Sequence, residues 1–227
     1  MAIRPVFIVN KKNISYVKEI NIDFKWYPGF SKKQKRKSIK SLHCNFLSET
    51  KYKDDKILEI STKSENMLGV QLSAFNLELK MSDQKAPVEC FFQSSKVFEE
   101  GGPYKELLYK SPYEVKKDNR LRNSGSLVSF ELNNENWPLK PKTLFYDWLY
   151  MNALNQNKKL IKQVMKFEAF TDIEFNPKKS INCQARSLAL YLSLKSRGIV
   201  EDIIRDKDEF IEFFKKDKGK KQMQLFN

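Results

Sequence analysis

The stretch VECFFQSSKVF, residues 88–98, has the spacing of an amphipathic helix that follows a proline. At about 100° per residue, Glu89, Gln93 and Lys96 fall within an arc of about 60°, and Phe91 and Phe92 occupy a separate stripe. We therefore expect a helix that buries its aromatic rings and holds a carboxylate, an amide and an ammonium group on a neighbouring face. A carboxylate beside a lysine at the wall of a pocket can carry out proton transfer or imine chemistry.

A purely structural interpretation of Glu89 is also open. If Pro87 is the first helical residue, Glu89 is the third. A carboxylate in the first turn interacts favourably with the helix dipole. The spacing alone therefore does not decide between a catalytic carboxylate and one that stabilises the helix.

The segments on either side of this stretch predict a mixture of helices and a few strands. Alternating apolar residues indicate strands at 19–26, 56–62 and 126–132, and an extended segment at 170–176. Apolar residues three and four apart indicate helices that begin at Ser31 and that span about 104–109, 112–120, 143–154, 157–168 and 183–197. Residues 215–227 are expected to fray. Because no linker divides the chain, the prediction is a single helix-rich α+β domain.

The charge balance of the chain suggests an anionic partner. Forty-two Lys and Arg residues against 28 Asp and Glu residues give the 227-residue chain a net charge of +14. Nucleic acid, a phosphorylated ligand or an anionic membrane would suit this excess, although a lysine-rich proteome would also produce it. No apolar run approaches the ~18 residues of a membrane span, and the N-terminus has no apolar signal segment. We expect a cytoplasmic protein that does not use a membrane.

The sequence has few of the residues and motifs that hold metals or cofactors. Cys44, Cys90 and Cys183 lie far apart, and His43 is the single histidine, so we expect neither a disulfide nor a metal site. The cysteines are interpreted as small buried hydrophobic residues. The sequence has no GxGxxG, P-loop, HExxH or GxSxG motif. We therefore expect no cofactor.

Two further groups of residues have more than one interpretation. Asp172 and Glu174 alternate along one face of the extended segment, where they could hold ribose hydroxyls or be solvated. Trp148 lies on the apolar side of the predicted helix 143–154, where it could stack on a base or fill the core. The sequence leaves both alternatives open.

Four segments resemble the NADAR superfamily, also called YbiA-like. VECFFQSSKVF resembles its signature helix, in which a Val-Glu-His-Tyr-Phe-Gln-Ala-x-Lys-Phe pattern is typical. LSAF (72–75) resembles its Leu-Ser-Asn-Phe, with Ala in place of Asn. SPYEVKKDNR (111–120) and WPLKPKTLFYDWLYMNAL (137–154) resemble two later segments, so the similarity covers roughly residues 65–198.

Three more segments resemble one branch of this superfamily in particular. FKWYPGFSKKQKRKSIKSLH (24–43), LEISTKS (58–64) and FTDIEFNPKKSINCQARS (170–187) are similar to the NADAR proteins encoded beside DarT-type toxins. These toxins attach ADP-ribose to guanine in DNA, and the neighbouring NADAR protein removes it. The resemblance implies an antitoxin that hydrolyses the N-glycosidic bond between ADP-ribose and guanine. Its partners would be ADP-ribosylated DNA, ADP-ribose as the product, and a DarT-type toxin.

The resemblance also implies an organisation and a set of site residues. An N-terminal extension, 1–64, would pack on a catalytic core, 65–204, and a C-terminal helix with a basic tail, 205–227, would follow. Glu89 would be the catalytic acid or base, and Lys96 either its electrostatic partner or the amine that forms a transient imine with ribose C1. The substrate would be bound by Ser73, Phe75, Asn76, Phe92, Gln93, Asp147, Trp148, Asp172, Asn182 and Arg186.

The basic segment after Ser31 gains a possible role from the same resemblance. Five cations could follow the DNA backbone without reading its sequence, or could form a solvated helix face: Lys32, Lys33, Lys35, Arg36 and Lys37. Two other functions remain open. One is an N-glycosidase for a small phosphorylated metabolite, as in YbiA-like proteins linked to riboflavin intermediates. The other is a non-catalytic protein that binds the toxin or the ADP-ribosylated nucleic acid.

Overall fold

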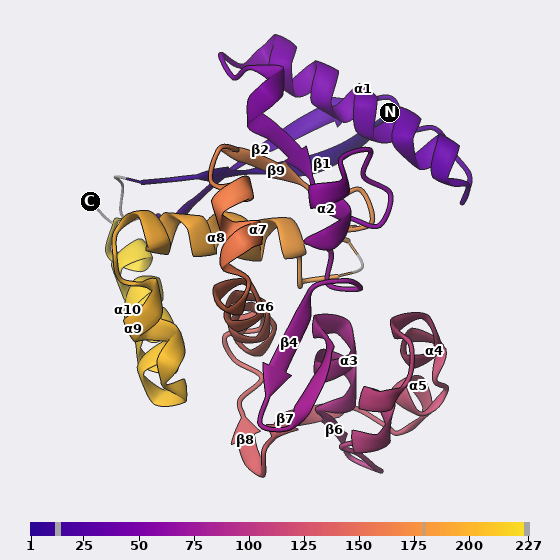
Figure 1. The fold of residues 1–227 in the computed structure, drawn as a ribbon, viewed down its shortest axis with the longest axis vertical. Helices are drawn as coiled ribbons and strands as arrows, with labels where there is room; N and C mark the ends of the chain where they lie inside the picture. Colours follow the sequence, from indigo (N-terminus) through magenta and orange to yellow (C-terminus); the bar gives the residue numbers. More distant parts are fainter. Residues whose placement is uncertain (12–14, 179, 225–227) are drawn as a thin grey trace.

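The fold is α+β and rich in helices, as the sequence predicts (Figure 1). The computed structural model describes residues 1–11, 15–178 and 180–224, with side chains described as far as Lys215. A four-stranded sheet lies at one end of the molecule, with helix α1 (Lys32–Glu49) on its outer side and helix α8 (Gln184–Ser196) on its inner side. Helix α6 (Leu144–Gln156) lies in the middle of the domain.

The sheet is formed by strands from both ends of the chain. Strands β1 (Ala2–Val9) and β2 (Val17–Phe24) make an antiparallel pair, and β9 (Ala169–Thr171) pairs antiparallel with β1. Strand β3 (Ile57–Glu59) then runs parallel to β9, which gives the order β2-β1-β9-β3. The sequence did not predict β1, because residues 5–8 are all buried and show no two-residue alternation. One sheet thus joins the N-terminal strands β1–β3 to β9 of the later part of the chain. The domain boundary proposed at residue 64 stays a prediction.

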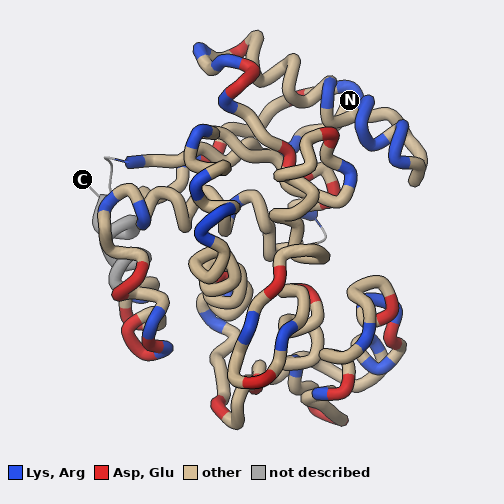
Figure 2. Tube along the Cα trace, in the orientation of Figure 1, with Lys and Arg blue, Asp and Glu red and all other residues tan. Residues whose placement is uncertain are grey.

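Helix α1 forms as its sequence predicts. The Ser31 hydroxyl accepts a hydrogen bond from the Gln34 amide at 3.2 Å, which satisfies a free donor of the first turn. Ile39, Leu42 and Phe46 are buried against the sheet. Lys and Arg residues lie along the first half of the helix (Figure 2), where Lys32, Lys33 and Lys37 are exposed and Lys35 and Arg36 are partly buried.

The signature stretch departs from the single helix that its spacing predicts. Helix α3 (Val88–Ser94) ends before Lys96, which begins strand β6 (Lys96–Phe98). Lys96 lies opposite Phe130 of strand β7 (Leu127–Leu132) in the antiparallel ladder. Strand pairing therefore replaces a further helical turn. The prediction that Glu89 and Lys96 lie on one face of the same helix is wrong.

The remaining elements complete the core and the cover of the domain. Strands β4 (Glu78–Met81) and β5 (Gln84–Pro87) form a hairpin, and β8 (Glu135–Trp137) extends the sheet of β6 and β7. The other helical segments are η1 (Asp54–Lys56), α2 (Met67–Gln71), η2 (Lys105–Tyr109), α4 (Pro112–Lys117), α5 (Arg120–Asn123), α7 (Lys158–Val164), α9 (Val200–Arg205) and α10 (Lys207–Gln224).

Several predicted boundaries need correction. The helix expected at 112–120 divides into α4 and α5, because Asp118 is extended and caps the Arg120 amide. The helix expected at 157–168 ends at Val164, because the Glu168 amide bonds to the Lys56 carbonyl beside the sheet. The tail expected to fray from residue 215 is helical as far as Gln224, and residues 225–227 lie outside the described part.

The extended segments are also shorter than predicted. The strand expected at 56–62 is β3, which ends at Glu59. The segment expected at 170–176 is a strand only to Thr171, because the Asp172 carboxylate accepts the amides of Glu174 and Phe175 and turns the chain. Asp172 and Glu174 therefore do not alternate along one extended face.

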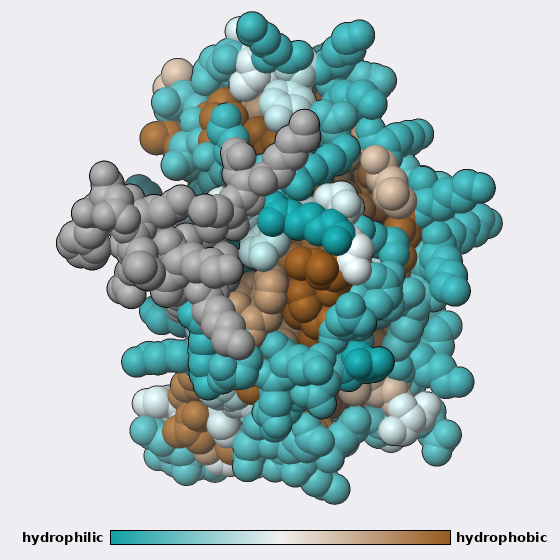
Figure 3. All heavy atoms as spheres, turned by 90° about the vertical axis from the view of Figure 1, so that its left-hand side faces the viewer, coloured by the Kyte–Doolittle hydropathy of each residue, from teal (hydrophilic) through white to brown (hydrophobic). Residues whose placement is uncertain are grey.

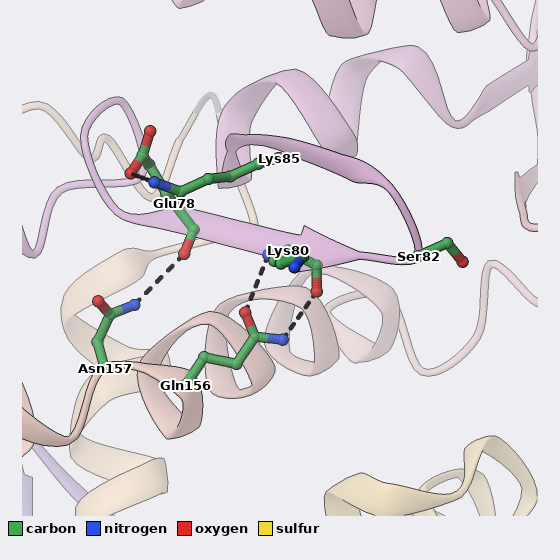
Figure 4. Close-up of a pocket in the computed structure, with 6 residues that line it drawn as sticks. All are labelled: Glu78, Lys80, Ser82, Lys85, Gln156 and Asn157. Carbon is green, nitrogen blue, oxygen red and sulfur yellow. Dashed lines mark hydrogen bonds and ion pairs between the residues drawn. The ribbon is translucent and has the colours of Figure 1, made fainter.

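Helix α6 organises the larger of two hydrophobic cores. Nearly all its side chains are buried, and the Phe145 ring stacks on Phe130 with ring centroids 4.6 Å apart. The Gln156 side chain at its end donates to the Lys80 carbonyl and accepts from the Lys80 amide, both at 2.9 Å (Figure 4). This amide covers the free edge of β4 above a groove of about 470 Å³.

Polar side chains cover most of the face in Figure 3.

A buried hydrogen bond from α6 supports the turn after α2. The Tyr150 hydroxyl, fully buried, donates to the Leu72 carbonyl at 2.6 Å. We expect Tyr150→Phe to lower the free energy of unfolding by about 1–3 kcal/mol, because it leaves a buried carbonyl without a donor. Urea unfolding monitored by circular dichroism measures this loss. The control is Tyr109→Phe, at a ring that is 78% exposed; equal midpoints for the two variants would contradict the assignment.

Candidate active site

A cavity of about 890 Å³ opens between the inner sheet edge and helices α3 and α6. Its size is that of a small-molecule site. Segments distant in the sequence line it: 61–63, 73–75, 89–96, 113–116, 127–130, 139–146, 172–175 and 180–184. The walls are therefore set by tertiary packing rather than by one motif.

Glu89 and Gln93 form one wall of this cavity from α3. Glu89 is 8% exposed, and its carboxylate Oε1 accepts a hydrogen bond from Gln93 Nε2 at 3.0 Å. The Glu89 amide donates to the Ala74 carbonyl at 3.0 Å, so the start of α3 is fixed to the neighbouring wall. Glu89 is thus both a first-turn carboxylate and a cavity residue, and the two interpretations of it are compatible.

Lys96 reaches the same cavity from β6. Its Nζ lies 5.0 Å from the centroid of the Phe92 ring. Burial lowers the pKa of Lys96; the charge of Glu89 raises it, and the charge of Lys116 lowers it. The net effect lowers the pKa, which increases the fraction of neutral amine at a given pH.

Asp172 faces the cavity from the turn after β9. It is 7% exposed, its Oδ1 accepts the amides of Glu174 and Phe175, and its Oδ2 lies 4.0 Å from the Cys183 sulfur. Burial, and then the charge of Glu59, raise the pKa of Asp172 well above its ordinary value. A carboxyl group in this state is a hydrogen-bond donor as well as an acceptor.

The cavity brings together most of the residues that the resemblance singles out. Eight of them line it: Ser73, Phe75, Glu89, Phe92, Gln93, Lys96, Asp172 and Asn182. Asn76 lies behind this wall and donates to the Ser73 hydroxyl at 2.9 Å. Asn182 Oδ1 is buried and has no hydrogen-bond partner among the described residues.

Four proposed substrate residues do not line the cavity: Asn76, Asp147, Trp148 and Arg186. Trp148 packs on Trp137, and its indole N–H donates to the Ile204 carbonyl at 3.2 Å. Asp147 accepts from Arg186 Nη1 at 3.1 Å and from a serine hydroxyl. On α6 it is Tyr146 that faces the cavity, and the next two residues turn away by about 100° each.

Several cavity residues gave no signal in the sequence. Gln184 accepts from the Ala74 amide and donates to the Ile60 carbonyl, each at 2.7 Å, and so joins three walls. Four lysines besides Lys96 line the cavity, which suits an anionic ligand: Lys63, Lys116, Lys140 and Lys142. These four cations lie in three separate segments, since only Lys140 and Lys142 are neighbours in the sequence, so no single motif groups them.

An aromatic pair also lines the cavity. The rings of Phe75 and Tyr113 meet edge to face with centroids 5.0 Å apart, and Lys116 Nζ lies 5.2 Å from the Phe75 ring. Tyr113 is 57% exposed. The flat face of an exposed ring beside cations can stack against a nucleobase.

The five cations of α1 divide into two groups. Lys35 forms an ion pair with Glu174 at 3.3 Å, and Arg36 donates to the carbonyls of Lys63 and Ser64 at 3.3 and 3.2 Å. Both residues therefore hold segments that line or adjoin the cavity. The other three are exposed and remain able to contact a ligand: Lys32, Lys33 and Lys37.

Comparison with known proteins identifies the family. The family model of the DarT1-associated NADAR antitoxins matches residues 2–224, and the chain belongs to this family of toxin-neutralising proteins. A search of curated proteins gave no match. Within the described residues, no helix is long and apolar enough to cross a membrane, and no three His, Cys, Asp or Glu side chains gather as a metal site.

The electrostatics of Lys96 can be tested without a substrate. We expect its pKa to lie below the ordinary value of about 10.4. Glu89→Gln should lower it further because it removes a favourable charge, whereas Lys116→Gln should raise it because it removes a repulsive one. NMR titration of ¹³C-methylated lysines, with Lys96→Arg to assign the signal, measures the three values. Shifts of the same sign in both variants would refute this arrangement of charges.

Proposed function

We propose that this antitoxin is a hydrolase that removes ADP-ribose from guanine in DNA. The observation that supports this most directly is the convergence of Glu89, Lys96 and Asp172 in one cavity whose lining is cationic and aromatic. ADP-ribose carries a diphosphate, two riboses and a base, so its binding calls for cations, hydroxyl partners and a stacking surface. Membership of a DarT1-associated family supports a DarT-type toxin as the functional partner.

The reaction requires two kinds of assistance. Positive charge that develops at the anomeric carbon needs a carboxylate nearby, and the leaving guanine needs a proton. Glu89 would provide the acid or base function, with Gln93 holding its orientation at 3.0 Å. The Glu89→Gln variant tests the role of Glu89, and borohydride trapping tests whether Lys96 forms an imine.

Lys96 has two possible roles. As a cation it would stabilise the substrate electrostatically. As a neutral amine it would attack C1 while the bond to guanine breaks and guanine takes up the proton that the amine loses. The C1–O4′ bond of the resulting glycosylamine would then break, with the remaining amine proton moving to the ring oxygen, to give an imine; water would hydrolyse the imine, regenerating the amine and releasing ADP-ribose. The lowered pKa of Lys96 supports the second role.

The substrate would extend across the cavity. Asn182 Oδ1, which has no partner among the described residues, would accept a hydrogen bond from a ribose hydroxyl. The lysines of the lining would face the phosphates, and Phe75 with Tyr113 would stack on a base. A small phosphorylated metabolite would use the same cations, so the metabolite N-glycosidase remains the second candidate.

The direct test uses a single-stranded oligonucleotide with one ADP-ribosylated guanine. We expect the wild-type protein to release ADP-ribose and Glu89→Gln to be slower by at least about 100-fold. Mass spectrometry follows the oligonucleotide, and borohydride reduction traps ADP-ribose on Lys96 if an imine forms. If the wild-type protein leaves the ADP-ribosylated guanine intact, the substrate is a metabolite or the protein acts by binding the toxin. If wild type and Glu89→Gln release ADP-ribose at equal rates, Glu89 takes no part in the reaction.

The exposed cations of α1 make a separate prediction. Neutralising Lys32, Lys33 and Lys37 to Gln should weaken binding of the modified oligonucleotide. It should also reduce the slope of log K against log salt by about 0.7 for each lost contact. Affinity for free ADP-ribose should not change, because the three side chains do not line the cavity. Fluorescence anisotropy at several salt concentrations measures these effects.

A matched control removes the same charge elsewhere. Lys158, Lys159 and Lys162 of α7 are exposed and lie outside the cavity lining. Their conversion to Gln should leave the oligonucleotide affinity closer to that of the wild type. If both triple variants lose affinity equally, net charge rather than α1 attracts the nucleic acid.

A further inference from the structure

Glu59 is a buried carboxylate that the reaction described above does not use. It is the last residue of β3 and is 2% exposed. Its Oε2 accepts a hydrogen bond from the Thr171 hydroxyl at 2.5 Å, and its Oε1 accepts one from the Ile173 amide at 2.9 Å. The two donors flank Asp172, so one carboxylate holds the chain on both sides of a cavity residue.

A neutral histidine completes this arrangement. His43 Nε2 lies 2.8 Å from the Thr171 hydroxyl oxygen. Because the Thr171 hydroxyl donates its proton to Glu59, its oxygen accepts from His43 N–H. Burial lowers the pKa of His43 to about 4, so at neutral pH the ring supplies a hydrogen-bond donor without a positive charge. The hydrogen-bonded chain therefore orients Glu59 but does not neutralise it.

The two carboxyl groups share a site with little compensating charge. Neither forms a salt bridge among the described residues. The titratable groups that interact with Asp172 are Arg4 on β1, Tyr146 and Tyr150 on α6, Glu174 in the turn after β9, and Cys183 before α8. Around them lie His43 and Lys35 on α1, which contact Thr171 and Glu174, and Arg186 on α8, whose charge acts on Cys183. Lys35 is paired with Glu174, and Arg186 with Asp147. The charge of Glu59 acts on Asp172, and two buried like charges that repel each other are not both ionised at low cost.

The hydrogen bonds decide which group ionises. Burial raises the pKa of Glu59, but the donors from Ile173, Thr171 and Ser61 oppose that shift. Asp172 receives two backbone donors on one oxygen, while its other oxygen lies beside a thiol. Three donors, one of them the Thr171 hydroxyl at 2.5 Å, favour the charge on Glu59, and its charge then raises the pKa of Asp172.

We propose that Glu59 is a positioning residue that clamps the chain around Asp172 and keeps the Asp172 carboxyl group neutral, as a hydrogen-bond donor to the ligand in the cavity. Its action on the substrate rests on the proposed function. A donor at this position would pair with an acceptor oxygen or nitrogen of the ADP-ribosylated nucleoside. A carboxylate there would instead require a hydroxyl or another donor.

The clamp is tested by NMR titration of protein labelled with ¹³C at the aspartate carboxyl carbon. The Asp172 signal is assigned by its loss in Asp172→Asn. We expect it to titrate at a higher pH than exposed aspartates. Glu59→Gln should lower its midpoint by about one pH unit or more, because the substitution removes a negative charge. Thr171→Val should shift it in the same direction, because it weakens the stabilisation of ionised Glu59.

The control is Glu168→Gln, which removes a partly exposed carboxylate next to β9 that pairs with Lys56. It should leave the Asp172 midpoint unchanged. The proposal is overturned if Asp172 titrates together with exposed aspartates, or if Glu59→Gln and Thr171→Val both leave its midpoint in place. The titration needs no substrate, so its result is independent of whether the protein hydrolyses ADP-ribosylated guanine.

Turnover provides the second measurement. With the modified oligonucleotide, the wild-type rate should fall as pH rises through the Asp172 midpoint, and Glu59→Gln should move this alkaline limb to lower pH by the same interval. An alkaline limb that stays fixed while the NMR midpoint moves would remove Asp172 from the substrate contacts. Absence of turnover at every pH would contradict the proposed function and leave the clamp to be judged by NMR.

Discussion

The parallel register that places Glu59 of β3 beside Thr171 of β9 is the constraint on which the cavity depends. It joins two segments 112 residues apart and turns the chain so that Asp172 faces inward. The residues after β3 then form one wall, and the Ile60 carbonyl receives Gln184 from the opposite wall. The N-terminal segment is therefore part of the site, and its role extends beyond carrying basic residues.

The transition from α3 to β6 places the two proposed catalytic groups in different electrostatic settings. Glu89 lies in the first turn of α3, beside the positive end of the helix dipole and under the Gln93 amide. Lys96 lies beyond the helix, where burial destabilises its ammonium form. Separate elements thus place the Glu89 carboxyl group at a helix N-terminus and the Lys96 amine at a partly buried strand position of one cavity.

Local signals in the sequence predicted the elements that are defined by local contacts. The Ser31 cap and the spacing of Ile39, Leu42 and Phe46 are sufficient for α1, and the signature stretch identified both Glu89 and Lys96. Long-range contacts explain what was missed. Glu59 and Gln184 form their hydrogen bonds with residues more than 100 positions away, so no local pattern marks them. Strand β1 is buried on both faces over residues 5–8, so its apolar and polar residues do not alternate there.

The central claim is that the cavity of Glu89, Lys96 and Asp172 receives the ADP-ribosylated guanosine. The most direct measurement is a crystal structure of Glu89→Gln with ADP-ribosyl-guanosine. We predict that the ribose next to guanine lies between residues 89 and 96, that a phosphate contacts a lining lysine, and that the Asp172 carboxyl group is within hydrogen-bond distance of an acceptor atom. Ligand bound only in the groove beside Gln156, or on α1 with the cavity empty, would contradict the account.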